Sequence, residues 1–149
     1  MNAMNLYELS NWLYRKKIGW MAKLVQKFNY FYHNSYIPFT AEIGKGTVFA
    51  YGGIGVVIHA NAIIGNKCMI GQGITIGGRT GHGGPPVIGN NVYIAAGSRV
   101  LGGITIGDNV IIGANAVVIK DVPDNCVVAG VPAKIISKDI SNFTTSDII

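Results

Sequence analysis

A six-residue aliphatic period between residues 58 and 118 constrains the fold of this chain more than any other feature. Isoleucine or valine recurs at every sixth position, with a single gap of twelve, at Ile58, Ile64, Ile70, Ile76, Ile88, Ile94, Val100, Ile106, Ile112 and Val118. Gly or Ala directly follows most of these residues, and a second small or aliphatic residue stands four places after all of them except Ile76. A period of six fits neither an α-helix nor a simple alternating strand. It is typical of a solenoid built from short repeats.

The repeat predicts a parallel β-helix of triangular cross-section. Three six-residue edges make one coil of about eighteen residues, with the aliphatic side chains pointing inward and Gly or Ala at corners too tight for a bulky Cβ. Stacking then places Ile58 under Ile76 and Ile94 near Ile112. Each buried aliphatic side chain contributes roughly 1.5–3 kcal/mol.

The repeat is interrupted twice. Phe49 and Ile58 are nine residues apart, so residues 50–55, which hold three glycines, are expected to bulge from the wall. Between Ile76 and Ile88 six extra residues are expected to protrude as a loop within residues 77–87. Solenoids carry such insertions on the binding face.

Composition indicates one folded domain in three segments. A length of 149 residues fits a single domain, and 49% hydrophobic against 13% charged residues excludes a disordered chain. We expect a helical segment at 1–35, the β-helix at 36–136 and a tail at 137–149. The net charge of +5 belongs mainly to the first segment, which holds five basic residues and one glutamate.

Residues 4–33 are predicted to be helical, because apolar residues fall on one side and no proline occurs before Pro38. The helix either packs on the solenoid and on neighbouring subunits, capping the first coil, or rests its basic and aromatic residues on a membrane surface. His33 is expected to be a capping or surface residue. Cys68 and Cys126 are expected to be buried thiols. No signal peptide or membrane-spanning stretch is visible, which predicts a cytoplasmic protein, and no nucleic-acid partner is expected.

His59 is the strongest catalytic candidate, since it occupies a corner position where the repeat otherwise has Gly or Ala. One coil later the same position is Gly77, followed by Gly78, which leaves a slot beside the imidazole. An imidazole at this position suits a general base, and the Gly78 N–H suits a donor to an oxyanion. His82, on the protruding loop, is the second candidate. The alternative is that His59 is a corner residue bonded to a turn and His82 a surface histidine.

Residues 106–134, IGDNVIIGANAVVIKDVPDNCVVAGVPAK, carry a family resemblance. They resemble the left-handed β-helix acyltransferases with hexapeptide repeats, the branch of serine acetyltransferases and polysaccharide O-acetyltransferases. The resemblance implies a left-handed β-helix and an acetyl-CoA-dependent O-acetyltransferase. The segment Gly55–His59 resembles the small sugar and capsule enzymes, which implies a saccharide hydroxyl as acceptor. Independently of the resemblance, Arg79 and the bulge residues Tyr51, Gly52 and Gly53 are candidate substrate contacts, because the glycines let a substrate approach the backbone closely.

Serine O-acetyltransferase is the alternative activity. The three motifs that carry the catalytic histidines of those enzymes match stretches that read Tyr36-Ile37-Pro38, Ala50-Tyr51-Gly52 and Pro85-Pro86 in this chain. Two other classes remain open. A hexapeptide-repeat carbonic anhydrase needs three zinc-binding histidines, and the three histidines here are dispersed along the chain, so no metal is expected. The other class is a non-catalytic β-helix scaffold.

The donor site is expected along the stacked coils. Ala96 and Ala114 are eighteen residues apart, so they stack and form a strip along which a pantetheine arm can lie. The resemblance implies that these alanines contact coenzyme A and that Lys134, with Lys120, meets its phosphates. Gly77 and Gly78 are further candidate contacts, because they leave a slot beside His59. It also implies a homotrimer or a pair of trimers.

Overall fold

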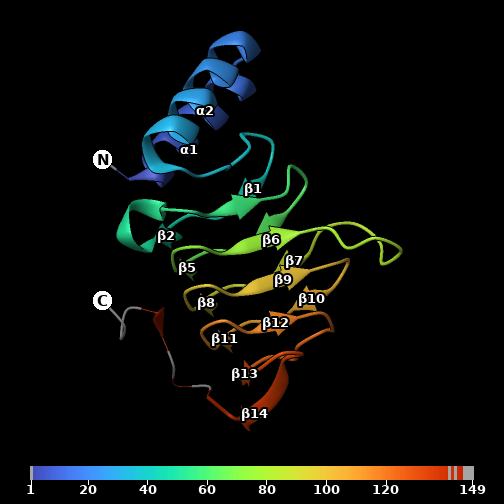
Figure 1. The fold of residues 1–149 in the computed structure, drawn as a ribbon. Coiled ribbons are helices and arrows are strands. Elements are labelled where there is room, and N and C mark those ends of the chain that lie inside the picture. Colours follow the sequence, from blue (N-terminus) through green and yellow to red (C-terminus); the bar gives the residue numbers. More distant parts are fainter. Residues whose placement is uncertain (1, 141, 143, 146–149) are drawn as a thin grey trace.

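The computed structural model describes residues 2–140, 142 and 144–145, and it is a parallel β-helix with two helices at its N-terminal end (Figure 1). The predicted fold class, a β-helix preceded by a helical segment, is confirmed.

Short strands stack in three sheets that form the three walls. Sheet A consists of β3 (Val57–Ile58), β6 (Thr75–Gly77), β9 (Arg99–Leu101) and β12 (Val117–Val118). Sheet B consists of β1 (Glu42–Ile43), β4 (Ile63–Ile64), β7 (Val87–Ile88) and β10 (Thr105–Ile106). Sheet C consists of β2 (Val48–Phe49), β5 (Met69–Ile70), β8 (Tyr93–Ile94), β11 (Ile111–Ile112), β13 (Cys126–Ala129) and β14 (Lys134–Lys138).

The strand register confirms the expected stacking. Ile58 pairs with Ile76 in sheet A, and Ile94 pairs with Ile112 in sheet C. These inward side chains are buried, because alternate residues of each strand point into the prism. Cys68 and Cys126 are free and buried, as expected. Burial raises the pKa of the Cys68 thiol.

Both interruptions lie where the repeat predicts them. The short 3₁₀ segment η1 (Ala50–Gly53) forms the bulge between sheets C and A, and the second insertion lies between β6 and β7. Its loop projects sideways from the stack in Figure 1. The last coil is shorter than the others: Ile111 pairs with Val127, two residues earlier than an eighteen-residue coil would require.

The N-terminal segment is a hairpin of two helices, so the prediction of one helix over 4–33 is wrong. The helices are α1 (Ala3–Arg15) and α2 (Gly19–His33). Between them Lys17 takes a left-handed φ of 62°, and the Ile18 N–H donates to the Leu13 carbonyl oxygen. This turn folds α2 back onto α1. No proline occurs at the break, and Gly19 comes only after it. The sequence pattern therefore does not predict the break.

Helix α1 caps the first coil. Ala3, Met4 and Tyr7 belong to the same buried cluster as the solenoid core. The Tyr7 hydroxyl donates to the Ala41 carbonyl oxygen at 2.7 Å and accepts from the Ile43 N–H at 3.2 Å. The open end of the β-helix is therefore closed by α1, as one of the two alternatives for this segment required.

His33 is buried rather than at the surface, which corrects the expectation for this residue. It is the last residue of α2, and its Nδ1 lies 2.9 Å from Asn29 Oδ1. Asn29 in turn donates to the Ala3 carbonyl oxygen at 2.9 Å. The buried histidine therefore belongs to the packing of α2 on α1.

The expected boundary between β-helix and tail, at residue 136, falls inside β14, which pairs antiparallel with β13. The tail residues 141, 143 and 146–149 lie outside the described part of the chain. Among the described residues, no helix is long and apolar enough to cross a bilayer.

Candidate active site

His59 lies at the corner where the chain leaves sheet A for sheet B, here called the AB corner (residues 59–62, 78–86, 102–104 and 119–122). Its backbone is fixed by the coils, because the His59 N–H donates to the Ile76 carbonyl oxygen and the His59 carbonyl oxygen accepts from Ala62. The imidazole is exposed. The corner thus holds the backbone rigidly while the ring stands outside the prism wall.

The imidazole has one hydrogen bond that determines its tautomer. The Asn61 N–H donates to His59 Nδ1 at 3.1 Å. The neutral ring therefore carries its proton on Nε2 in this rotamer, and Nε2 is presented as a donor. For Nε2 to accept a proton, the ring has to release Asn61 and move its own proton to Nδ1. Sequence reasoning missed Asn61, because a contact through a backbone N–H carries no residue-type signal.

The next coil has no side chain beside His59, as predicted. The pairing of Val57 with Thr75 and of Ile58 with Ile76 places Gly77 next to His59. A Cβ added at Gly78 would meet no atom within 4 Å. The AB corner is therefore open at the level directly after the histidine.

The protruding loop is tied to the following coil near its middle. The His82 N–H donates to the Arg79 carbonyl oxygen, and the His82 carbonyl oxygen accepts from Gly103 at 2.7 Å. The imidazole of His82 itself is exposed. Arg79 and His82 therefore belong to the AB corner together with His59, on a turn with a defined position.

Lys120 and Lys134 lie around one hollow at the end of the last coil. The hollow measures about 300 Å³ and is also lined by the carboxylate-bearing Asp121. Asp121 Oδ1 accepts from the Thr105 N–H at 2.8 Å, so that carboxylate is engaged in fixing the coil. Three strand spacings separate β3, which precedes His59, from β12, which precedes Lys120, about 14 Å along the axis.

The remaining predicted residues occupy a different edge, the CA corner between sheets C and A (residues 50–56, 71–74, 95–98 and 113–116). Ala96 and Ala114 stack there, since the Asn115 N–H donates to the Ala96 carbonyl oxygen and Ile94 pairs with Ile112. The bulge lies at the same corner, because the Gly73 N–H donates to the Ile54 carbonyl oxygen. Within one chain, sheet A separates these residues from His59.

Tyr51 stands out within the bulge. Its φ of 50° and ψ of 36° lie in the left-handed region, which costs a non-glycine residue roughly 1–2 kcal/mol. The side chain is 77% exposed, so no packing compensates the strain. Strained, exposed residues of this kind occur preferentially at functional sites.

No cluster of three or more His, Cys, Asp and Glu side chains that could hold a metal occurs in the described part of the chain. His33 is used inside the helical hairpin, while His59 and His82 belong to the AB corner.

Comparisons with known proteins agree with this architecture. The family model described as bacterial transferase hexapeptide (six repeats) matches residues 85–120. A serine acetyltransferase of Synechococcus elongatus is 39% identical over 136 residues, which are 90% of this chain and 55% of that protein. A serine acetyltransferase of Helicobacter pylori strain J99 is 38% identical over 141 residues, which are 93% of this chain and 82% of that protein.

A solved structure extends the likeness to three dimensions. The crystal structure of a serine acetyltransferase from Brucella abortus strain S19 in complex with coenzyme A superposes with a TM-score of 0.86 at 33% identity. The alignment covers 92% of this chain and 55% of that one. The chain thus spans little more than half the length of the Synechococcus and Brucella proteins.

Proposed function

The chain belongs to the serine acetyltransferase family of hexapeptide-repeat transferases, and from this premise we propose that it transfers the acetyl group of acetyl-CoA to the hydroxyl of L-serine. The observation that carries the proposal is the likeness to the Helicobacter pylori enzyme, which spans 93% of this chain and 82% of that protein. The acceptor expected from the Gly55–His59 segment, a saccharide, becomes the second candidate.

In the proposed reaction the serine hydroxyl oxygen attacks the thioester carbonyl carbon while His59 takes the hydroxyl proton. The Gly78 N–H stabilises the oxyanion of the tetrahedral intermediate, which collapses as the C–S bond breaks. The thiolate of coenzyme A leaves and takes the proton back from the imidazole. The exposed ring of His59 and the open space at Gly78 support these roles.

We propose that coenzyme A lies along the axis of the solenoid. The hollow with Lys120 and Lys134 receives the phosphates, and the pantetheine arm extends over the remaining coils toward the level of His59. The axial separation of about 14 Å is of the order that an extended arm bridges. The stacked alanines Ala96 and Ala114 form the opposite side of its path.

Because sheet A separates the two corners within one chain, we further propose that the site is formed between subunits of a trimer. The AB corner of one subunit faces the CA corner of its neighbour, so that His59 meets Ala96, Ala114 and Tyr51 of another copy. Closed cyclic symmetry then gives three equivalent sites.

One observation favours the saccharide candidate. The stretches that match the catalytic-histidine motifs of the serine acetyltransferases hold Pro38, Tyr51 and Pro85 here. Tyr51 is exposed and held in a strained conformation, which suits an aromatic platform for a sugar ring.

The test is release of coenzyme A thiol from acetyl-CoA with L-serine, simple sugars, nucleotide sugars and oligosaccharides. Turnover with L-serine alone supports the proposal, and turnover with a saccharide alone replaces it by the second candidate. Absence of turnover together with absence of acetyl-CoA binding favours the scaffold alternative. For substitutions of the site lysines Lys120 and Lys134, the matched control is Lys45→Ala, which replaces an exposed lysine where sheet B passes to sheet C and is expected to leave activity unchanged.

A further inference from the structure

Helix α2 is packed with its polar residues inward and its large apolar residues outward. Asn29 and His33 are buried against α1, whereas Trp20 is 71% exposed and Phe31 is 72% exposed. Five of the large exposed side chains of α2 are linked by steps of three or four residues, the spacing of one helix face: Trp20, Leu24, Phe28, Phe31 and Tyr32. We call these five residues the α2 face. An apolar stripe of this size on a surface helix indicates a binding partner.

Four residues of the α2 face form a contiguous surface. Leu24, Phe28 and Phe31 line one shallow depression with Lys27, and the rings of Phe28 and Tyr32 stack with centroids 5.7 Å apart. Aromatic rings and long aliphatic chains next to ammonium groups are typical of helices that lie in the headgroup region of a bilayer.

The charged side chains of α2 and of the turn before it are all positive. Lys23 and Lys27 lie on the helix, Lys16 and Lys17 lie in the turn before it, and α2 contains no acidic residue. The partner of the α2 face is therefore expected to be anionic. A second copy of α2 would bring lysines against lysines, with no carboxylate on the helix to compensate them.

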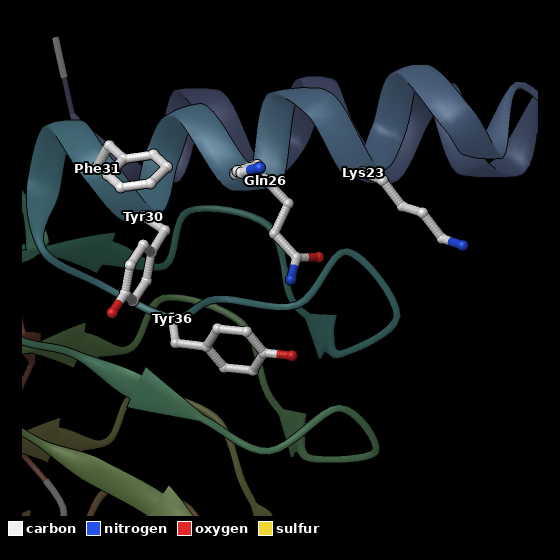
Figure 2. Close-up of a pocket in the computed structure, with 6 residues that line it drawn as sticks. Lys23, Gln26, Tyr30, Phe31 and Tyr36 are labelled. Atoms are coloured by element: carbon white, nitrogen blue, oxygen red, sulfur yellow. The ribbon is translucent and has the colours of Figure 1, made fainter.

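Two of these lysines also face a hollow of about 360 Å³ between α2 and the start of the β-helix. Figure 2 shows Gln26 and Tyr30 extending from α2 on the side of Tyr36, while Lys23 points away from that ring and Phe31 lies on the same helix. The hollow is mostly apolar with ammonium groups at its edge. This combination suits a phosphate-bearing headgroup joined to an acyl chain.

We propose that the α2 face binds the surface of an anionic lipid bilayer. The apolar side chains enter the boundary between headgroups and acyl chains, and Lys23 and Lys27 bind lipid phosphates. Since α1 caps the solenoid and α2 covers α1, this contact holds the β-helix at the membrane by its N-terminal end (Figure 1).

The proposal is tested by flotation of the full chain with vesicles of phosphatidylcholine alone or mixed with phosphatidylglycerol. Binding is expected only with the anionic vesicles and is expected to weaken as salt is added. Lys23→Gln with Lys27→Gln is expected to lower the affinity roughly 30-fold. Lys45→Gln with Lys138→Gln, exposed lysines of the solenoid, makes the same change in net charge and is expected to leave binding unchanged.

Insertion is followed through Trp20 in a Trp12→Phe background, where the fluorescence of the remaining tryptophan shifts to the blue on binding. Leu24→Ser with Phe31→Ser abolishes the shift if the α2 face enters the bilayer, and circular dichroism verifies that these exposed substitutions leave the fold intact. Equal binding of both vesicle types, or of all variants, overturns the proposal. So does an oligomer larger than a trimer that Leu24→Ser with Phe31→Ser dissociates, since the occupant is then a second copy.

Discussion

Among single residues, His59 decides the chemistry of the proposed site, and its two ring nitrogens have different roles. As a base it accepts a proton at Nε2, which requires release of the Asn61 N–H from Nδ1. As a donor it stays in the observed rotamer and stabilises negative charge with Nε2–H. The two roles differ in which neutral residue can replace the histidine.

We expect His59→Ala to lower kcat/KM by a factor of about 10²–10⁴, the contribution of a general base. His59→Gln, whose amide NH₂ reaches the position of Nε2–H but cannot accept a proton, is expected to lose as much. Steady-state kinetics and the pH profile of kcat/KM for both variants measure this. Substantial activity in the Gln variant alone assigns the donor role instead, and full activity in the Ala variant removes His59 from the mechanism.

Gly53 packs closely against the helical cap. Its φ is +86°, and a Cβ added there would lie 2.8 Å from the Cβ of Ala3 and 3.2 Å from the Cβ of Phe49. Gly73 is the matched control, since its φ is +64° and an added Cβ meets no atom within 4 Å. Gly73→Ala therefore measures backbone strain alone, while Gly53→Ala measures strain together with clashes against α1 and Phe49.

Gly73→Ala is expected to lower the free energy of unfolding by about 1–2 kcal/mol through strain. Gly53→Ala is expected to cost about 1–3 kcal/mol more, because the added methyl group crowds Ala3 of α1 and Phe49 of the first coil and disturbs their packing. Urea unfolding followed by circular dichroism measures both values. Equal costs would mean that α1 yields without loss of packing.

Among the elements, α1 is attached to the first coil by the Tyr7 hydroxyl. Burial raises the pKa of this hydroxyl above its ordinary value, with smaller opposing effects from the Ile43 hydrogen bond and Arg15. A raised pKa means that the folded chain holds this proton more tightly than the unfolded chain does. The resulting stabilisation is fully present below the unfolded pKa of about 10 and is lost as the pH rises through the folded pKa.

Tyr7→Phe is expected to lower the free energy of unfolding by about 1–3 kcal/mol at neutral pH, since the Ala41 carbonyl and the Ile43 N–H lose their partner. The difference in unfolding free energy between the two chains is expected to shrink above pH 10. There the hydroxyl of Tyr7 ionises first in the unfolded chain, which stabilises the unfolded state. Tyr14→Phe, an exposed ring on the same helix, is the control and is expected to change stability by less than about 0.5 kcal/mol. A difference that stays constant with pH would contradict the raised pKa of the Tyr7 hydroxyl.

The sequence predicts those elements whose residues repeat. A six-residue period fixes which side chains point inward, so the pairing of Ile58 with Ile76 and the positions of both insertions followed directly. The helical hairpin did not follow, because its break at Lys17 depends on the packing of α2 against α1 and not on a local breaker residue. The shortened last coil was missed for a similar reason, since aliphatic residues occur at several registers between Val122 and Val128.

The stacking of the candidate residues was predictable, but their arrangement around the prism was not. Steps of eighteen residues correctly stack Ala96 with Ala114, and the same step correctly places His59 beside Gly77. The period alone does not show that these two columns belong to different corners of the prism. That depends on the order in which the chain visits the three sheets, and it separates the alanines from the histidine within one chain.

For the whole molecule, this separation makes the proposed site dependent on a second subunit. If His59 and Ala114 serve one site from different copies, the two corners can be inactivated in different chains. His59→Ala removes the imidazole from the AB corner. Ala114→Trp places a bulky ring over the stacked alanines at the CA corner. Each variant alone is expected to be inactive.

Refolding the two variants together in equal amounts is expected to restore about a quarter of the unsubstituted activity, because one in four interfaces then pairs an intact AB corner with an intact CA corner. Mixing the unsubstituted chain with a chain that carries both substitutions separates the possibilities further. Shared sites leave about a quarter of the activity in that mixture, whereas sites contained in one chain leave about half and give no restoration in the first mixture. The refolded species are sized by light scattering to confirm subunit exchange, and activity of the two mixtures then decides whether the catalytic groove lies within one solenoid or between two.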